Sequence, residues 1–278
     1  PNPALVYRGI GGFGREASFT VQEEQGGRGL VLEMISPTGL ALTRTIKLDD
    51  AYLLEVVDTF ANRGAVPLNI PEHRLTMGFM QESSGGKSLY VPYSLGVDVS
   101  LYGGKGVEYL GKKRMPKLVK AGRGLEAKQR LNEPVDWVAV KNRFFTQIVR
   151  QEEGGDDCLY IARRESPKGK VLSEVAAEVV FDSLVVAAGA TRERAYTYYM
   201  GPKKHAILLG YRFEQEKVME FGLFTPICKV LLTFMNAIHD KLWPHNYGLA
   251  IMLLTVLIRV IFWPITHAGT VNMKKMQD

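Results

Sequence analysis

Four polar positions interrupt an otherwise apolar stretch late in the sequence, and they could act on charged substrates. At 100° per residue, Gly248, Thr255, Arg259 and Thr266 fall within about 40° of one another, so a helix would gather them in one stripe. A guanidinium stays protonated in proteins and needs water, an acidic group or carbonyl oxygens nearby. The stripe could therefore offer a fixed positive charge to a polar segment. The plainer alternative is that Arg259 extends its side chain to the nearer membrane interface.

The stretch that carries the stripe has the length and composition of a transmembrane helix. Residues 247–265 contain eleven Leu, Ile, Val and Phe residues and would span roughly 28 Å, close to the ~30 Å hydrocarbon core. These residues favour insertion by at most about 5 kcal/mol, whereas a central arginine opposes it by about 3 kcal/mol. We therefore expect insertion, with Trp243, Tyr247 and Trp263 as interface anchors near its ends.

Before this stretch, residues 225–242 have the pattern of an amphipathic helix. Apolar residues, Phe234 and Ile238 among them, recur at helical spacing, and polar residues occupy the opposite face. Thr225 is the predicted N-cap, with Pro226 at the first helical position. Such a helix could pack on a soluble domain or lie on a membrane surface, and the adjacent span favours the membrane.

No other motif predicts a catalytic, metal or nucleotide site. The glycines of residues 11–14 lack a following helix pattern, and residues 85–88 lack the first glycine of a phosphate-binding loop. The five histidines have no metal-ligand spacing, and the two cysteines cannot build a disulfide framework or a zinc site. We expect no cofactor and no metal. The basic residues of 112–120 are interpreted as a solvated turn, so we expect no nucleic-acid partner.

The composition changes near residue 220. The mean hydropathy of −0.05 and the net charge of +6 suggest an ordinary soluble protein. However, the first 220 residues carry 57 of the 64 charged side chains, and the last 58 residues carry the other 7. A segment of about 220 residues can bury a full core of its own. We therefore predict a soluble domain over 1–220, the amphipathic helix within 221–243 and the transmembrane helix within 244–266.

The soluble domain reads as mainly β. Alternating apolar residues over 40–48 and 54–60 are typical of half-buried antiparallel strands, and further strands are predicted over 4–10, 18–23, 30–35, 87–102, 136–149, 158–163, 171–181 and 194–200. Residues 175–186 could equally be helical. Ten or more short strands with few helices favour a β-sandwich or a stack of two large sheets.

The C-terminal segments resemble the YidC family of membrane protein insertases. The similar stretches are Phe221–Ile227, Leu231–His239, Asn246–Thr266 and Met273–Gln277. Earlier segments resemble the periplasmic domain of that family, namely Leu42–Asn62, Trp137–Phe145 and Tyr199–Lys204. The resemblance covers nearly the whole chain, with the C-terminal 58 residues the more specific part. A minor departure is Asn272, where relatives often have serine.

The resemblance implies an architecture. It consists of a large periplasmic β-sandwich, a supersandwich similar to galactose mutarotases, then an interfacial helix and the first of five core transmembrane helices. Residues 1–246 would be periplasmic, and residues 267–278 would begin a cytoplasmic helical hairpin of a multi-pass protein of the cell inner membrane. The groove arginine of the family maps onto Arg259, with Thr255, Gly248 and Thr266 beside it. The other core helices and an N-terminal anchor are expected outside this sequence.

The resemblance also implies a function without enzymatic chemistry. An insertase and chaperone of this family would assist the insertion, folding and assembly of inner-membrane proteins, alone or with the Sec translocon (SecYEG, SecDF). Its implied partners are nascent membrane proteins, the ribosome and membrane lipids.

Two alternatives remain open. A membrane-anchored sugar-active or carbohydrate-binding β-sandwich would use the tail only as an anchor, and it predicts His and Glu side chains that converge in a cleft. A receptor or scaffold would bind a partner through residues 1–220, and a generic apolar helix could then replace its span.

Overall fold

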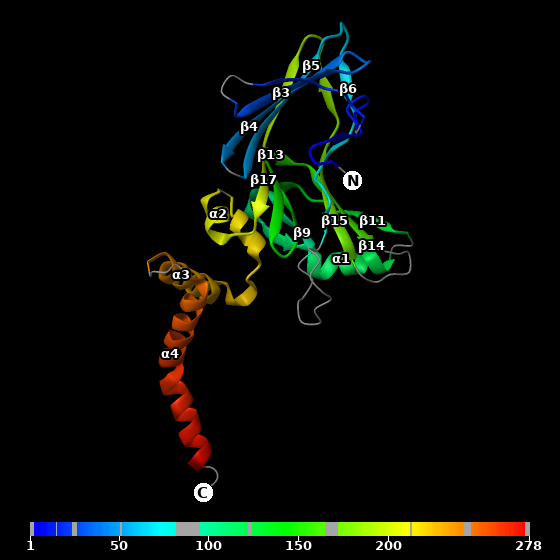
Figure 1. Ribbon diagram of the computed structural model, residues 1–278. Coiled ribbons are helices and arrows are strands. Elements are labelled where there is room, and N and C mark those ends of the chain that lie inside the picture. The colour runs from blue at the N-terminus through cyan, green and yellow to red at the C-terminus, as the bar shows by residue number, and fades with distance from the viewer. Residues whose placement is uncertain are drawn as a thin grey trace. The chain divides into compact units, whose positions relative to one another are not determined.

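The computed structural model describes residues 3–14, 16–23, 27–50, 52–81, 95–121, 124–164, 172–211, 213–241 and 246–275. The chain divides into two compact units, residues 1–218 (unit 1) and residues 219–278 (unit 2). Unit 1 consists mainly of strands, and unit 2 is helical (Figure 1).

The larger sheet of unit 1 has nine antiparallel strands in the order β10-β9-β12-β13-β17-β5-β4-β3-β2. Their bounds are β2 Thr20–Glu23, β3 Gly29–Ile35, β4 Leu40–Asp50, β5 Leu53–Asn62, β9 Gly96–Leu101, β10 Gly106–Tyr109, β12 Val135–Lys141, β13 Phe145–Gly155 and β17 Thr191–Pro202. Strand β17 lies near the middle, because it pairs with both β13 and β5.

The second sheet has six strands, with β1-β7-β15-β14-β11 in order and β8 also paired to β15. Their bounds are β1 Tyr7–Arg8, β7 His73–Thr76, β8 Met80–Gln81, β11 Glu126–Arg130, β14 Asp157–Arg164 and β15 Leu172–Phe181. A separate pair joins β6 Leu68–Ile70 to β16 Leu184–Val186. The predicted sandwich of two large sheets is confirmed.

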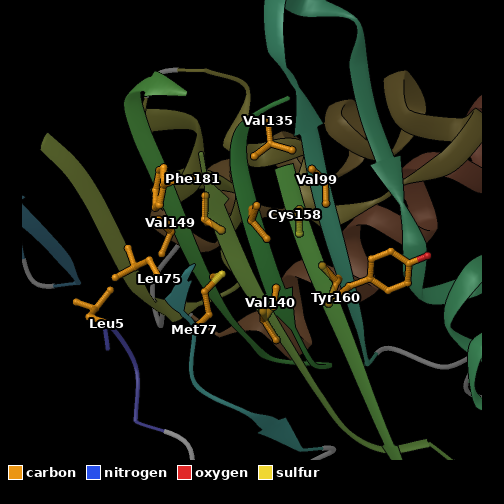
Figure 2. Packing of buried hydrophobic residues seen from close by; sticks show 14 of the residues in the cluster. Leu5, Leu75, Met77, Val99, Val135, Val140, Val149, Cys158, Tyr160 and Phe181 are labelled. Atoms are coloured by element: carbon orange, nitrogen blue, oxygen red, sulfur yellow. The ribbon is translucent and has the colours of Figure 1, made fainter. Parts of the chain in front are cut away.

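The core lies where strands of the two sheets face each other. Val99 and Val140 from the larger sheet, and Cys158 and Phe181 from the smaller one, are at most 2% exposed and belong to one cluster (Figure 2). Every member of this cluster lies between residues 5 and 198. Unit 1 therefore has a hydrophobic core of its own, as its length allows.

The expectation of a solvated turn at residues 112–120 is wrong, because this segment belongs to helix α1, Leu110–Ala121. Leu110, Met115 and Val119 are at most 2% exposed and pack into the core cluster, while Lys117 and Lys120 face solvent. The charged residues of this segment are interspersed with apolar residues that lie on one face of the helix. Burial of that face stabilises the helix.

The strand predictions differ from the structure mainly in extent. The run over 136–149 is two strands, β12 and β13, joined by a turn at Asn142. In the run over 4–10 only Tyr7 and Arg8 join a sheet. The segment 175–186, which could have been helical, forms strands instead. Of the strand predicted over 87–102, residues 87–94 lie outside the described part of the chain.

Short helices complete unit 1 and lead into unit 2. The 3-10 helix η1 spans Tyr102–Gly104, α2 spans His205–Gly210, and the 3-10 helix η2 spans Gln215–Met219. In unit 2 the 3-10 helix η3, Gly222–Phe224, precedes α3, Thr225–Lys241, and α4, Tyr247–Lys275. Both long helices were predicted. The prediction of Thr225 as the N-cap of α3 is wrong, because Thr225 has helical backbone angles and its hydroxyl donates back to the Gly222 carbonyl at 2.5 Å.

Candidate functional site

Helix α4 carries the predicted polar stripe, and its start is set by a local cap. The Asn246 side-chain Oδ1 accepts a hydrogen bond from the Gly248 backbone N–H at 2.7 Å, which satisfies a donor that the first turn leaves unpaired. The helix then continues for 29 residues, through Pro264 and up to Lys275. No helix end therefore marks the predicted boundary between residues 266 and 267.

The stripe residues are all exposed, but they differ in what they offer. The hydroxyl of Thr255 donates to the Ile251 carbonyl at 2.7 Å, and that of Thr266 donates to the Phe262 carbonyl at 2.7 Å. Each of these hydroxyls thus donates its proton within its own helix, and the Thr255 oxygen keeps acceptor lone pairs. Arg259 forms no ion pair or hydrogen bond with any described residue. Its guanidinium is therefore the strongest donor on the stripe.

Among the described residues of unit 2, α3 packs against the start of α4. The rings of His239 and Tyr247 stack with centroids 3.9 Å apart, and Ala250 is completely buried. These contacts lie in the first turn of α4, whereas Thr255 and Arg259 lie further along it. The structure thus brings the stripe together on one helix, and the described residues supply no further wall for a groove around Arg259.

The predicted interface residues lie on exposed or half-buried surfaces of α3 and α4. Phe234 is 49% exposed, Tyr247 is 50% exposed, Trp263 is 70% exposed and Ile238 is half-buried. Trp243 lies outside the described residues. Phe234 continues an exposed apolar row on α3 that also contains Ile227 and Val230, and Phe224 is exposed just before this helix. Apolar rows of this kind mark contact with a partner or a membrane.

The stretch Tyr247–Pro264 is long and apolar enough to cross a membrane. The core helix of a soluble protein could pass the same test, but such a helix would be mostly buried. Of these 18 residues only Ala250 is buried. Most of the other apolar side chains are exposed, and Leu249, Leu254 and Ile258 are half-buried, which is a distribution that a lipid environment favours.

In unit 1 a cleft of about 520 Å³ opens beside the ends of β13 and β17. Its lining consists of Tyr52, Met80, Phe145, Thr146, Gln147, Met200, Gly201, Pro202 and Lys204. This described lining contains no histidine and no carboxylate. It is therefore not the convergent His and Glu arrangement that the sugar-active alternative predicts.

Unit 1 also holds a buried carboxylate, Asp58, with no exposed surface. It accepts hydrogen bonds from Arg44 Nε at 2.6 Å and Nη2 at 2.8 Å, from the Tyr7 hydroxyl at 2.8 Å and from the Tyr196 hydroxyl at 3.1 Å. Burial, and next the charge of Asp58, raises the pKa of the Tyr7 phenol, so this hydroxyl stays a donor. Four donors surround the carboxylate, so the network is structural.

His73 is equally unsuited to proton transfer at neutral pH. It is 1% exposed, and burial lowers the pKa of its imidazole to about 4. Arg194 Nη1 lies 2.7 Å from Nε2, and the Pro71 carbonyl lies 2.9 Å from Nδ1. Because arginine can only donate, Nε2 accepts and Nδ1 carries the proton. Sequence reasoning missed both buried groups, although Arg44 and Asp58 occupy inward positions of the alternating runs.

The two units together define a class of protein: a β-sandwich followed by a helix that is long and apolar enough to span a membrane and carries one arginine. Residues 13–234 match the family of the YidC periplasmic domain. The chain therefore belongs to the YidC family, as the sequence motifs predicted.

Curated relatives are described as membrane protein insertase YidC. The protein from Syntrophobacter fumaroxidans is 30% identical over 151 residues, which cover 53% of this chain and 26% of the relative. The one from Citrifermentans bemidjiense is 25% identical over 262 residues, which cover 92% of this chain and 44% of the relative. The chain thus spans less than half the length of these relatives.

Solved structures similar to the chain include two sugar-related proteins. A galactose mutarotase related enzyme from Lactobacillus acidophilus has a TM-score of 0.42 at 12% identity, covering 67% of this chain and 72% of that one. A galactose mutarotase-like protein from Lactobacillus casei has a TM-score of 0.44 at 12% identity, covering 72% and 83%.

Proposed function

We propose that this chain is the periplasmic domain, interfacial helix and first core transmembrane helix of an inner-membrane protein insertase. Membership of the YidC family supports the class of function. The observation that carries the proposal is Arg259, an exposed cation with no ion-pair partner among the described residues, on the polar stripe of an otherwise apolar helix. A mere anchor would gain nothing from a charge at this depth, because the charge opposes insertion.

The depth of Arg259 determines what it can do. It lies roughly 18 Å along the helix from Tyr247 and roughly 8 Å from Pro264, since each residue advances 1.5 Å. In a bilayer, water or an acidic group would have to reach the guanidinium. A carboxylate at about 8 Å would be stabilised by about 0.5 kcal/mol in a water-like medium and by about 2 kcal/mol at an effective dielectric constant of 20.

The proposed reaction is assisted partitioning. A short acidic tail of a nascent membrane protein is drawn toward Arg259, and the acceptor oxygen of Thr255 binds water or the hydrogen-bond donors of that tail. The apolar segment of the substrate then enters lipid, and burial of that segment drives completion. No covalent step and no nucleotide is needed. Gly248, in the first turn of α4, adds no side chain to this stripe.

Location and partners follow the same proposal. Residues 1–246 would lie in the periplasm and residues 267–278 in the cytoplasm, where they would begin a helical hairpin. The interface residues Phe234, Ile238, Trp243, Tyr247 and Trp263 would contact lipid headgroups. Nascent membrane proteins would be substrates, with the Sec translocon and the ribosome as partners.

The test uses the complete protein that contains this chain, reconstituted in vesicles with a single-span substrate. Arg259→Ala should slow insertion of a substrate with an acidic tail by between about twofold and about thirtyfold, the factors that correspond to the energies above. Arg259→Lys should retain much of the activity. The matched control is the same substrate with amides in place of its acidic side chains, for which the alanine variant should differ little. Equal insertion of the acidic substrate by wild type and Arg259→Ala would refute the role of the charge.

A second comparison separates insertion from anchoring. Residues 247–265 are replaced by a generic apolar helix of the same length. The insertase proposal expects insertion to fail although the protein remains in the membrane. Retained function would instead favour the receptor or scaffold alternative, in which the span only tethers unit 1.

A further inference from the structure

An exposed apolar and basic surface lies at the turn between β12 and β13, beside the end of β17. It consists of Arg143, Phe144, Phe145, Met200, Lys203 and Lys204, which we call the turn patch. The two phenylalanines are each 52% exposed and Met200 is 57% exposed. Large apolar side chains that are grouped and half exposed are unusual on a soluble surface, and they mark an interaction site.

The turn patch is held in place by its buried neighbour Asn142. The Asn142 Oδ1 accepts hydrogen bonds from the backbone N–H groups of Phe144 at 2.9 Å and Phe145 at 2.8 Å, and its Nδ2 donates to the Gln81 carbonyl at 2.9 Å. Asn142 is 7% exposed, so these bonds are shielded from water. The exposed rings are thus presented by a fixed turn and lose little freedom on binding.

Strand pairing adds the remaining members of the patch. Phe145 lies opposite Pro202, and Gln147 lies opposite Met200, so Phe145 and Met200 are diagonal neighbours on one face of the β13 and β17 pair. The backbone N–H of Lys203 donates to the Phe144 carbonyl at 2.7 Å, which fixes the two lysines beside the rings. Met200 and Phe145 also line the 520 Å³ cleft, together with Lys204.

The charges of the patch are all positive. The guanidinium of Arg143 lies 5.2 Å from the centre of the Phe144 ring, and Lys204 is exposed. Lys203 donates from Nζ to the Asn142 carbonyl at 3.0 Å. Asp49 and Asp50 end the strand β4, which precedes β5, and the three cations of the patch outnumber these two acids. Aromatic rings with neighbouring cations suit the headgroup region of an anionic bilayer, where rings enter the interface and cations bind phosphates.

We propose that the turn patch docks unit 1 onto the anionic headgroup surface of the membrane. The length of the chain supports this occupant. Unit 1 ends at residue 218, and the apolar stretch begins at Tyr247. The intervening residues 219–246 include the 17-residue helix α3, so unit 1 stays within roughly 60 Å of the bilayer. Such a tether keeps unit 1 near lipid, so the patch meets the headgroup surface at a high local concentration.

The experiment uses residues 1–218, whose core is complete without unit 2. Binding is measured by co-sedimentation with vesicles of equal parts phosphatidylcholine and phosphatidylglycerol, and with vesicles of phosphatidylcholine alone. We expect binding to the anionic vesicles and much weaker binding to the neutral ones. Because each cation near such a surface contributes about fivefold, Arg143→Gln with Lys204→Gln should weaken binding about 25-fold.

The apolar arm of the test is Phe144→Ser with Phe145→Ser, which should weaken binding about tenfold for each ring that enters the interface. The matched control is Val66→Ser with Val185→Ser, two side chains that are 64% and 60% exposed elsewhere on unit 1 and should leave binding unchanged. Circular dichroism verifies the fold of each variant. Phe144→Trp keeps an aromatic ring, and its emission should shift to the blue on anionic vesicles and be quenched by brominated lipid.

Three outcomes would overturn the proposal. Wild-type residues 1–218 could fail to sediment with anionic vesicles, or the two patch variants could bind as tightly as wild type. A third is that Phe144→Trp shows no spectral change while the same patch variants lose binding to purified translocon, which would assign the surface to a protein partner. Each result is independent of the Arg259 insertion assay.

Discussion

Removal of the buried carboxylate of Asp58 should destabilise unit 1 strongly. Arg44 and Asp58 are direct cross-strand partners in β4 and β5, and their side chains are 7% and 0% exposed. In Asp58→Ala the guanidinium loses both carboxylate bonds, and two tyrosine hydroxyls lose their acceptor. The Leu5 carbonyl remains the partner of Arg44 Nη1.

The magnitude follows from that geometry. Removing one partner of a buried ion pair typically costs 3–5 kcal/mol, and each orphaned buried hydroxyl adds about 1 kcal/mol or more, although such terms do not simply add. We therefore expect Asp58→Ala to lower the free energy of unfolding by about 5 kcal/mol. This is a large share of the 5–15 kcal/mol that is usual for a domain.

The assay is equilibrium urea unfolding of residues 1–218, followed by circular dichroism. A double-mutant cycle uses Asp58→Ala, Arg44→Met and the double variant. Without Asp58, the buried charge of Arg44 destabilises the folded state. The double variant should therefore lose less free energy of unfolding than the two single variants together, by about 2 kcal/mol or more. Additive losses, or an Asp58→Ala effect below about 1 kcal/mol, would refute the reasoning.

Two further predictions concern buried titratable groups of unit 1. The pKa of His73 is about 4 in the folded protein, against 6.5 for an unperturbed histidine. Between pH 6.5 and pH 4 the unfolded chain therefore binds one proton more than the folded chain, so the free energy of unfolding falls as the pH drops through this range. The loss is about 3 kcal/mol, and urea unfolding of His73→Gln should lack this part of the pH dependence. Cys158 is fully buried, and burial raises the pKa of its thiol, whereas Cys228 is partly exposed on α3. A thiol reagent should therefore modify one cysteine quickly in the native chain and both after denaturation, and rapid native labelling of Cys158 would contradict the packing.

Local sequence patterns were sufficient to predict a helix or strand when one face of that element is apolar along its length. The alternation over 40–48 and 54–60 predicted β4 and β5, and the apolar stretch from Tyr247 predicted the start of α4, because periodicity records which face of an element is apolar. The helix α1 was missed because its apolar face is not evident from periodicity. Charged residues dominate its sequence pattern, and its three buried apolar side chains indicate a helix only beside the strands that they cover.

The polar stripe on α4 was also determined by the sequence alone, since four residues on one helix need only helical geometry to align. Only the tertiary structure determined which side chains far apart in the sequence contact each other. Asp58 meets Tyr196 across 138 residues, and Asn142 fixes the turn patch through the Gln81 carbonyl. Such contacts depend on strand register, and register depends on the whole set of long-range pairings rather than on neighbouring residues.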